Sequence, residues 1–122
     1  MMVLSNEICK GDIYLIQFDP TIGDEIAKTR PAVILDNNYS NLELRIVVPI
    51  TSWQDKFETW DWMLKLNANT LNGLAKDSAI NCYQIKSISL ERFVKKIGVV
   101  NPHTLKMINL IITSILLILF RS

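Results

Sequence analysis

The chain has 122 residues, of which 49% are hydrophobic and 20% are charged, so its composition is that of a folded protein and not of a disordered one. This length fits one domain with its own core, and we expect residues 1–122 to form a single domain. The formal net charge of +1 excludes attraction of a polyanion by overall charge. Any nucleic-acid site must therefore be a local basic patch.

The residues that most often hold metals are sparse and scattered. Cys9 and Cys82 lie far apart without a metal-ligand spacing, and the single histidine, His103, has no neighbouring ligands. We therefore expect no metal site and no cofactor. Residues 1–10 carry no secretory signal, which predicts a cytoplasmic protein with both thiols reduced.

Six short runs with the character of strands precede one helix. The runs cover residues 13–18, 31–35, 45–50, 60–66, 78–85 and 96–100. Pro49 within the third run predicts an edge strand or a bulge. Ser89 is expected to cap a single helical turn over residues 90–93. Many short strands and one terminal helix predict a mainly β fold, a small and strongly bent barrel over about residues 9–100.

The helix is predicted over about residues 102–120. Asn101 and Pro102 are typical of a helix start. The apolar stretch that follows, Met107–Phe120, is shorter than the about 20 residues that a membrane-spanning helix needs. Because its last turn is apolar on every face, we expect it to be buried against the barrel and a second subunit, with no membrane as partner.

Arg30 is the first candidate for chemistry. It follows a polar loop and precedes Pro31 at the start of a predicted strand. A guanidinium offers five donors in a planar fork that matches phosphate oxygens, and it stays charged. When RNA is cleaved without a metal, charge builds on the phosphate oxygens, and a fixed guanidinium stabilises that charge. The competing interpretation is a structural ion pair of Arg30 with Asp24 or Glu25.

Thr51 and Ser52 are the second candidates. They follow the run 45–50, and their hydroxyls could donate to a phosphate oxygen or position the attacking hydroxyl. A threonine at the end of a strand more often bonds its own backbone, and that interpretation stays open.

Lysines and aromatic side chains could supply a surface for RNA. The candidates are Lys28, Lys56, Lys76 and Lys86 for steering phosphates, with Trp53 and Phe57 for stacking on unpaired bases. Solvated lysines and core aromatics explain the same residues equally well. Trp60 and Trp62 are expected to pack together on one strand face.

Several short motifs follow one another along nearly the whole chain. They are Gly11-Asp-Ile-Tyr14, Asp19-Pro20, Gly23-Asp-Glu25, Thr29-Arg-Pro31, Val48-Pro-Ile-Thr51-Ser52, Asn72-Gly-Leu-Ala-Lys-Asp-Ser78, Gln84-Ile-Lys-Ser-Ile88 and Lys96-Ile-Gly98. Their order and spacing resemble the MazF/PemK family, the toxins of type II toxin–antitoxin modules.

The resemblance implies an SH3-like or CcdB-like bent β-barrel with a C-terminal helix, and a homodimer bound by a cognate antitoxin. It also implies a sequence-specific endoribonuclease for single-stranded RNA that needs no metal and leaves a 2′,3′-cyclic phosphate and a 5′-hydroxyl. Arg30 and Thr51 match the family's catalytic positions. The residues expected to contact RNA are Lys28, Thr29, Ser52, Trp53, Tyr83 and Gln84.

Tyr83 departs from the family pattern, in which an acidic residue commonly precedes the glutamine and can serve as general base. A phenol is a poor base near neutral pH. Glu25 and Asp24 are the alternative bases. Two other functions stay open: a CcdB-like toxin that binds gyrase, and a non-catalytic RNA-binding relative.

Overall fold

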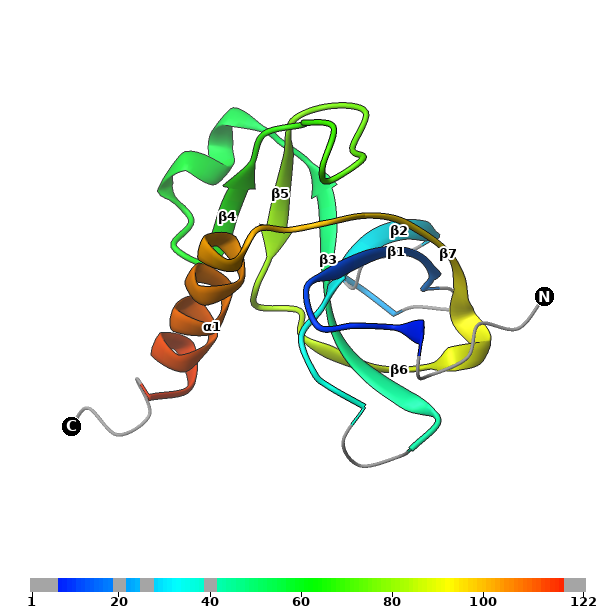
Figure 1. Ribbon diagram of the computed structural model, residues 1–122. Helices are drawn as coiled ribbons and strands as arrows, with labels where there is room; N and C mark the ends of the chain where they lie inside the picture. Colours follow the sequence, from blue (N-terminus) through cyan, green and yellow to red (C-terminus); the bar gives the residue numbers. More distant parts are fainter. Residues whose placement is uncertain (1–6, 19–21, 25–27, 39–41, 118–122) are drawn as a thin grey trace.

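The computed structural model describes residues 7–18, 22–24, 28–38 and 42–117 (Figure 1). Glu25 and the predicted last turn of the helix, 118–120, lie outside these ranges. The strands are β1 (Asp12–Gln17), β2 (Thr29–Ile34), β3 (Leu44–Ser52), β4 (Met63–Leu66), β5 (Ser78–Asn81), β6 (Lys86–Ser89) and β7 (Phe93–Val99). Two short 3-10 helices, η2 (Asp55–Thr59) and η3 (Leu90–Arg92), and the helix α1 (Pro102–Leu117) complete the structure.

The strands form one antiparallel sheet in the order β4-β5-β3-β2-β1-β7, and β6 also pairs with β3. The sheet curls strongly, so that β7 and β6 are brought together through η3 (Figure 1). The prediction of a mainly β, strongly bent fold with a C-terminal helix is confirmed. Within the described strands the sheet is not closed, because β4 and β7 end the path without pairing with each other.

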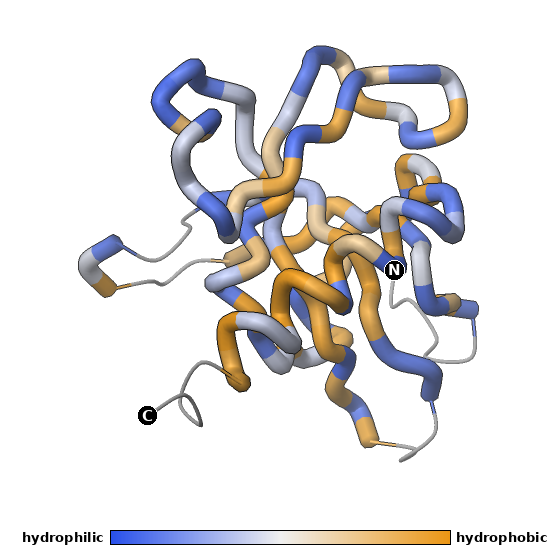
Figure 2. Tube along the Cα trace, turned by 90° about the vertical axis from the view of Figure 1, so that its left-hand side faces the viewer, coloured by the Kyte–Doolittle hydropathy of each residue, from blue (hydrophilic) through white to orange (hydrophobic). Residues whose placement is uncertain are grey.

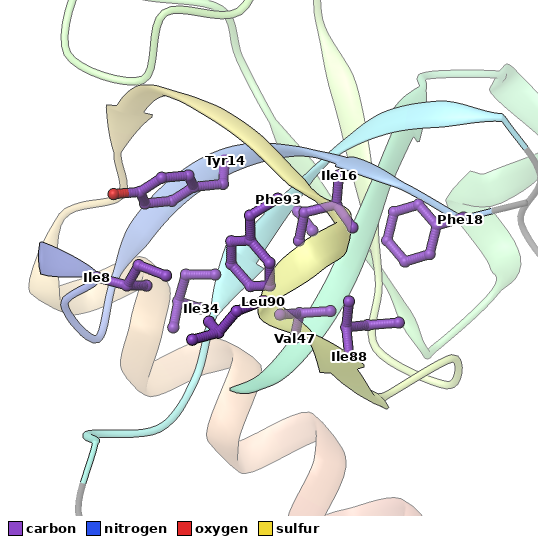
Figure 3. Close-up of a cluster of buried hydrophobic side chains, with 10 residues drawn as sticks. Ile8, Tyr14, Ile16, Phe18, Ile34, Val47, Ile88, Leu90 and Phe93 are labelled. Carbon is purple, nitrogen blue, oxygen red and sulfur yellow. The ribbon is translucent and has the colours of Figure 1, made fainter. Parts of the chain in front are cut away.

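Each face of the curled sheet buries its own apolar cluster. The concave side holds one cluster in which the rings of Tyr14 and Phe93 meet edge to face at 5.6 Å (Figure 3). The other side buries Ile13, Val33 and Ile80 against Ile108 of α1. Hydrophobic residues accordingly concentrate along the strands and α1, whereas the connecting loops are mostly hydrophilic (Figure 2). Alternate residues of β1 and β2 serve the two clusters because strand side chains point to opposite faces.

Three of the predicted strands have different bounds. The run 60–66 is a strand only from Met63, and the rings of Trp60 and Trp62 stack at 5.4 Å before it. The run 78–85 contains only β5, since the chain turns after Asn81, whose side chain accepts from the backbone N–H of Tyr83 at 3.2 Å. β6 therefore forms a separate strand that was not predicted. The last strand begins three residues early, at Phe93.

Pro49 was wrongly predicted to mark an edge or a bulge. β3 is a nine-residue strand, and Pro49 lies opposite Ala32 of β2 in a regular register. On the other side of β3, pairing with β6 ends at Val47 and pairing with β5 begins at Ile50. The missing N–H of Pro49 falls where β3 changes partner, so a central strand tolerates it.

The predicted starts of η3 and α1 are both confirmed. The side chain of Ser89 accepts from the N–H of Glu91 at 3.3 Å and caps η3, as predicted. α1 begins at Pro102, and the side chain of Asn101 accepts from the N–H of Thr104 at 2.8 Å. No helix in the described ranges is both long and apolar enough to cross a bilayer.

Candidate active site

Arg30 and Thr51 lie on the neighbouring strands β2 and β3. The pairing of these two strands ends at Ala32 and Pro49. Beyond that point Arg30 remains paired with β1, and Thr51 is paired with β5. The two residue types with the best claim to phosphate chemistry are therefore each held in the sheet, on adjacent strands, just past the end of their shared pairing.

Both residues line one cavity of about 390 Å³. Its floor is apolar, and its polar side chains are three cations and three hydroxyl groups. The lining residues are Leu15, Arg30, Pro31, Ile50, Thr51, Ser52, Gly73, Leu74, Ala75, Lys76, Ser78, Lys95 and Ile97. None of these described residues is acidic, so the field inside the cavity is positive and favours an anion.

Arg30 is half-buried, and its Nε atom is buried without a hydrogen-bond partner. Among the described residues Arg30 forms no ion pair, so Asp24 does not neutralise it, and Glu25 lies outside the described ranges. A buried donor without a partner costs free energy unless a ligand satisfies it. The guanidinium is thus a donor held ready for an anion.

One wall of the cavity is the loop between β4 and β5. Asn72, buried inside the loop, accepts from the N–H of Asn69 and of Leu74 at 3.1 and 3.0 Å. Gly73 lies so close to β7 that a Cβ there would be 2.0 Å from the carbonyl oxygen of Ile97. Its φ of +68° is also one that glycine adopts without strain. The Asn72-Gly73 pair thus fastens this wall to β7.

The loop before β2 lies outside the lining of the cavity. Lys28 has a φ of 67°, and its carbonyl accepts from the N–H of Phe18 at 2.9 Å. Thr29 is exposed and donates to the side chain of Gln17 at 2.6 Å. Gln84 donates through Nε2 to the carbonyl of Asp24 at 3.2 Å. Gln84 therefore contacts the segment that precedes β2, although neither Gln84 nor Asp24 lines the cavity.

Trp53 begins a chain of aromatic rings that leads away from the cavity. It meets Phe57 at 5.8 Å, Phe57 meets Trp60 at 5.0 Å, and Trp62 meets Tyr83 at 6.0 Å. Lys56 lies over the ring of Trp60 at 5.5 Å. Of the four lysines proposed for steering, only Lys76 lines the cavity; Lys28, Lys56 and Lys86 do not.

Tyr83 lines a second, larger cavity of about 860 Å³, beside α1. The lining is mostly apolar and includes Ile85, Leu110 and Leu116, which are 43%, 52% and 58% exposed. Cys82 also lines it, and burial raises the pKa of its thiol to about 12. The structure thus separates Tyr83 from Arg30 and Thr51 within one subunit.

These features define a class: a bent β-sheet with a C-terminal helix and a cationic cavity at the β2–β3 strand ends. The profile of the PemK-like, MazF-like toxins of type II toxin–antitoxin systems matches residues 9–116. The chain therefore belongs to this toxin family.

Two related proteins and two solved structures are similar to this chain. Endoribonuclease MazF9 of Mycobacterium tuberculosis is 32% identical over 96 residues, which cover 73% of this chain and 79% of that protein. Endoribonuclease PemK of Escherichia coli is 30% identical over 84 residues, or 67% of this chain and 61% of PemK. The crystal structure of MazF from Deinococcus radiodurans has the same fold, with a TM-score of 0.74 at 20% identity over 87% of this chain and 93% of that one. A mycobacterial endoribonuclease solved with its cognate antitoxin gives a TM-score of 0.66 at 18% identity, covering 88% and 92% of the two chains.

Sequence reasoning missed Lys95, because an exposed lysine within a strand carries no signal of its own. A weaker signal did exist in the neighbouring Lys96-Ile-Gly98 motif. A Cβ at Gly98 would lie 2.3 Å from the backbone of Asn72, so this glycine allows β7 to touch the loop. That contact brings β7, and with it Lys95, to the cavity.

Proposed function

We propose that this chain is the toxin of a type II toxin–antitoxin system and a sequence-specific endoribonuclease for single-stranded RNA, mRNA included. In this proposal residues 1–122 act as one domain in the cytoplasm. The products are a 2′,3′-cyclic phosphate and a 5′-hydroxyl, and no metal is needed. Family membership and the two endoribonuclease relatives support the activity.

The observation that carries the proposal is the unpartnered, buried Nε of Arg30 in a cavity that also contains Thr51. A fixed fork of N–H donors in a cavity without described carboxylates suits a phosphate group. Because the donors are held in place before the substrate arrives, no reorganisation is needed when charge develops. The geometry therefore serves a phosphorane-like transition state better than it serves a neutral ligand.

In the proposed reaction the RNA's own 2′-oxygen attacks the adjacent phosphorus, and the bond from phosphorus to the 5′-oxygen breaks. Arg30 donates hydrogen bonds to the phosphate oxygens as their charge grows. Thr51, with Ser52 beside it, positions the phosphate or the attacking hydroxyl. The 2′-hydroxyl proton leaves to a base, and the departing 5′-oxygen takes up a proton.

The base is proposed to be Glu25, or else Asp24. The cavity lining contains no described aspartate, glutamate or histidine, so the base must come from outside it. Asp24 is held near the β5–β6 turn by Gln84, and Glu25 is next to it in the chain. Lys28, Thr29, Trp53, Tyr83 and Gln84 are proposed to contact the RNA on either side of the cleaved linkage.

The second cavity supports a homodimer and an antitoxin as partners. Leu110, Leu116 and Leu117 of α1 are all more than half exposed, at 52%, 58% and 53%. Such an apolar surface is costly in water and is typical of an interface. We propose that a second copy covers this face. An antitoxin is proposed as partner because related folds were solved in complex with one.

The test uses purified protein, a mixed-sequence RNA and EDTA, with mapping of the new 5′ ends. The wild-type protein is expected to cut at one short motif and to leave 5′-hydroxyl ends. Arg30→Ala should lower kcat by about 100- to 1,000-fold, the effect of removing one oxyanion donor. Lys106→Ala, on the exposed start of α1, is the control and should cut normally. Full cutting by both Arg30→Ala and Thr51→Ala would overturn the proposal.

A further inference from the structure

Two ammonium groups share the cavity with Arg30 but come from different elements. Lys76 lies on the loop between β4 and β5, and Lys95 lies on β7. Both side chains are exposed, and neither has an ion-pair partner among the described residues. With Arg30 they place three positive charges around a space of about 390 Å³. Like charges repel, so this grouping has a cost that a bound polyanion would remove.

Lys95 belongs to the cavity because of the sheet register. It pairs with Leu15 of β1, and Leu15 pairs with Pro31 of β2. Lys95, Leu15 and Pro31 therefore lie in one row across β7, β1 and β2. Pro31 directly follows Arg30 in the chain, so this row ends beside Arg30. Its neighbour Lys96 takes part in a different contact, an ion pair of 3.2 Å with the buried carboxylate of Asp12. Two consecutive lysines therefore have separate surroundings.

Hydrogen bonds hold the backbone around Lys76. The side chain of Ser78 donates to the carbonyl of Lys76 at 2.9 Å, and the carbonyl of Asp77 accepts from the N–H of Trp53 at 3.1 Å. The carboxylate of Asp77 accepts from the N–H of Ala68 at 2.9 Å. The backbone that carries Lys76 is therefore fixed. The carboxylate of the neighbouring Asp77 already accepts a hydrogen bond within the loop.

We propose that Lys76 and Lys95 together bind a second phosphate of the RNA, adjacent to the one that Arg30 holds. This rests on the proposed function and deepens it. Arg30 makes directional hydrogen bonds to the reacting phosphate, whereas the two lysines act as flexible point charges on its neighbour. By holding two successive phosphates, the cavity sets which linkage of a bound strand reaches Thr51 and gives the strand a direction.

An acidic protein segment is negatively charged like RNA and is the competing ligand. The planar fork of Arg30 accepts either anion, but the strand-end hydroxyls beside it favour a phosphodiester, since a chain of carboxylates lacks regularly spaced tetrahedral groups. The experiment below therefore includes an acidic peptide.

The test measures binding of a cleavage-site oligonucleotide that carries 2′-deoxyribose at the scissile position, so that it binds without being cut. Wild type, the double variant Lys76→Ala with Lys95→Ala, and the control Lys106→Ala are titrated between 50 and 200 mM salt. Each phosphate contact contributes about 0.7 to the slope of log K against log salt for single strands, so the double variant, which loses one phosphate contact, should lose about 0.7. The ratio of wild-type to variant affinity should then shrink about 2.6-fold over this salt range.

A second series replaces one phosphate at a time with a neutral methylphosphonate. Wild type should lose affinity at one position next to the scissile linkage, and the double variant should be insensitive there. With cleavable RNA, KM should rise in the variant while kcat changes little, because the lysines bind but do not stabilise the transition state.

The outcomes separate the two proposals. If wild type binds and cuts RNA but the double variant keeps its salt slope and its methylphosphonate sensitivity, this inference is wrong and the proposed function stands. If the lysine changes affect only the binding of a polyglutamate peptide, the lysines serve an acidic protein segment and the inference is again overturned. If wild type neither binds nor cuts RNA, both proposals fall.

Discussion

Arg30 and Thr51 border the same cavity from two neighbouring strands, β2 and β3. Arg30 is paired with Ile16 of β1 and Thr51 with Ala79 of β5, so each is held by backbone pairing and not by a flexible loop. Strand ends are more rigid than loops as a support for reacting groups. The backbone that carries the guanidinium is therefore fixed, although its Nε has no hydrogen-bond partner.

Arg30→Lys should be nearly as harmful as removal of the side chain. Lysine keeps the charge but loses the planar fork and the Nε donor that is buried in the cavity. We expect kcat to fall about 100-fold with little change in KM, measured by initial rates of RNA cleavage. Arg92→Lys is the matched control, because Arg92 bonds the carbonyl of Gln17 outside the cavity. Equal activity of Arg30→Lys and wild type would contradict the proposed role.

Gly73→Ala should displace the cavity wall. A Cβ at this position would lie 2.0 Å from the carbonyl oxygen of Ile97, so the loop must move away from β7. The expected result is a lower Tm together with loss of RNA cleavage.

Gly23→Ala is the control for this substitution. Gly23 also has a positive φ, of 63°, but a Cβ there would meet no atom of the described residues within 4 Å. It should cost only the backbone strain, about 1–2 kcal/mol of the free energy of unfolding. If the two alanine variants unfold at the same temperature, the contact between the loop and β7 contributes nothing to stability.

Asp36→Ala should destabilise the fold through the buried Arg45. The Nε of Arg45 lies 3.0 Å from the Asp36 carboxylate, and its side chain is fully buried. Removing the carboxylate breaks the ion pair of a buried guanidinium, which costs about 3–5 kcal/mol. Urea unfolding should show this loss, and adding Arg45→Met should recover part of it. Additive effects of the two substitutions would show that the pair is not coupled.

Cys82 should make stability fall at high pH. Burial raises the pKa of its thiol from an ordinary value of 9.0 to about 12. The contribution to stability is complete below pH 9 and is lost as pH rises towards 12, because the unfolded thiol ionises first.

Unfolding curves at pH 8 to 10.5 in a Cys9→Ser background test this. Wild-type Cys82 should lose up to about 1.4 kcal/mol per pH unit more than Cys82→Val. Identical curves for the two proteins would show that Cys82 is exposed in the native state.

The strand pattern was readable from the sequence where local chemistry is specific, and so were Arg30, Thr51 and Ser52, three residues that line the cationic cavity. Alternation and β-branched runs predicted β1, β2 and β3, and Asn101-Pro102 predicted the start of α1. Prediction was wrong for the run 78–85, where the side chain of Asn81 turns the chain and the strand ends at Asn81. The apolar run alone could not reveal this, since one hydrogen bond decides it.

By itself, the sequence determined which residues could do phosphate chemistry, because a guanidinium and a hydroxyl carry that capacity wherever they lie. Only the tertiary structure decided which of them meet. The pairing of β2 with β3 brings Arg30 and Thr51 to one cavity, and the close approach at Gly73 and Gly98 brings in Lys76 and Lys95. Tyr83, which was also predicted to contact RNA, lines another cavity, beside α1. The reason is physical: pairing between distant strands depends on the packing of the whole sheet, and short sequence motifs do not contain it.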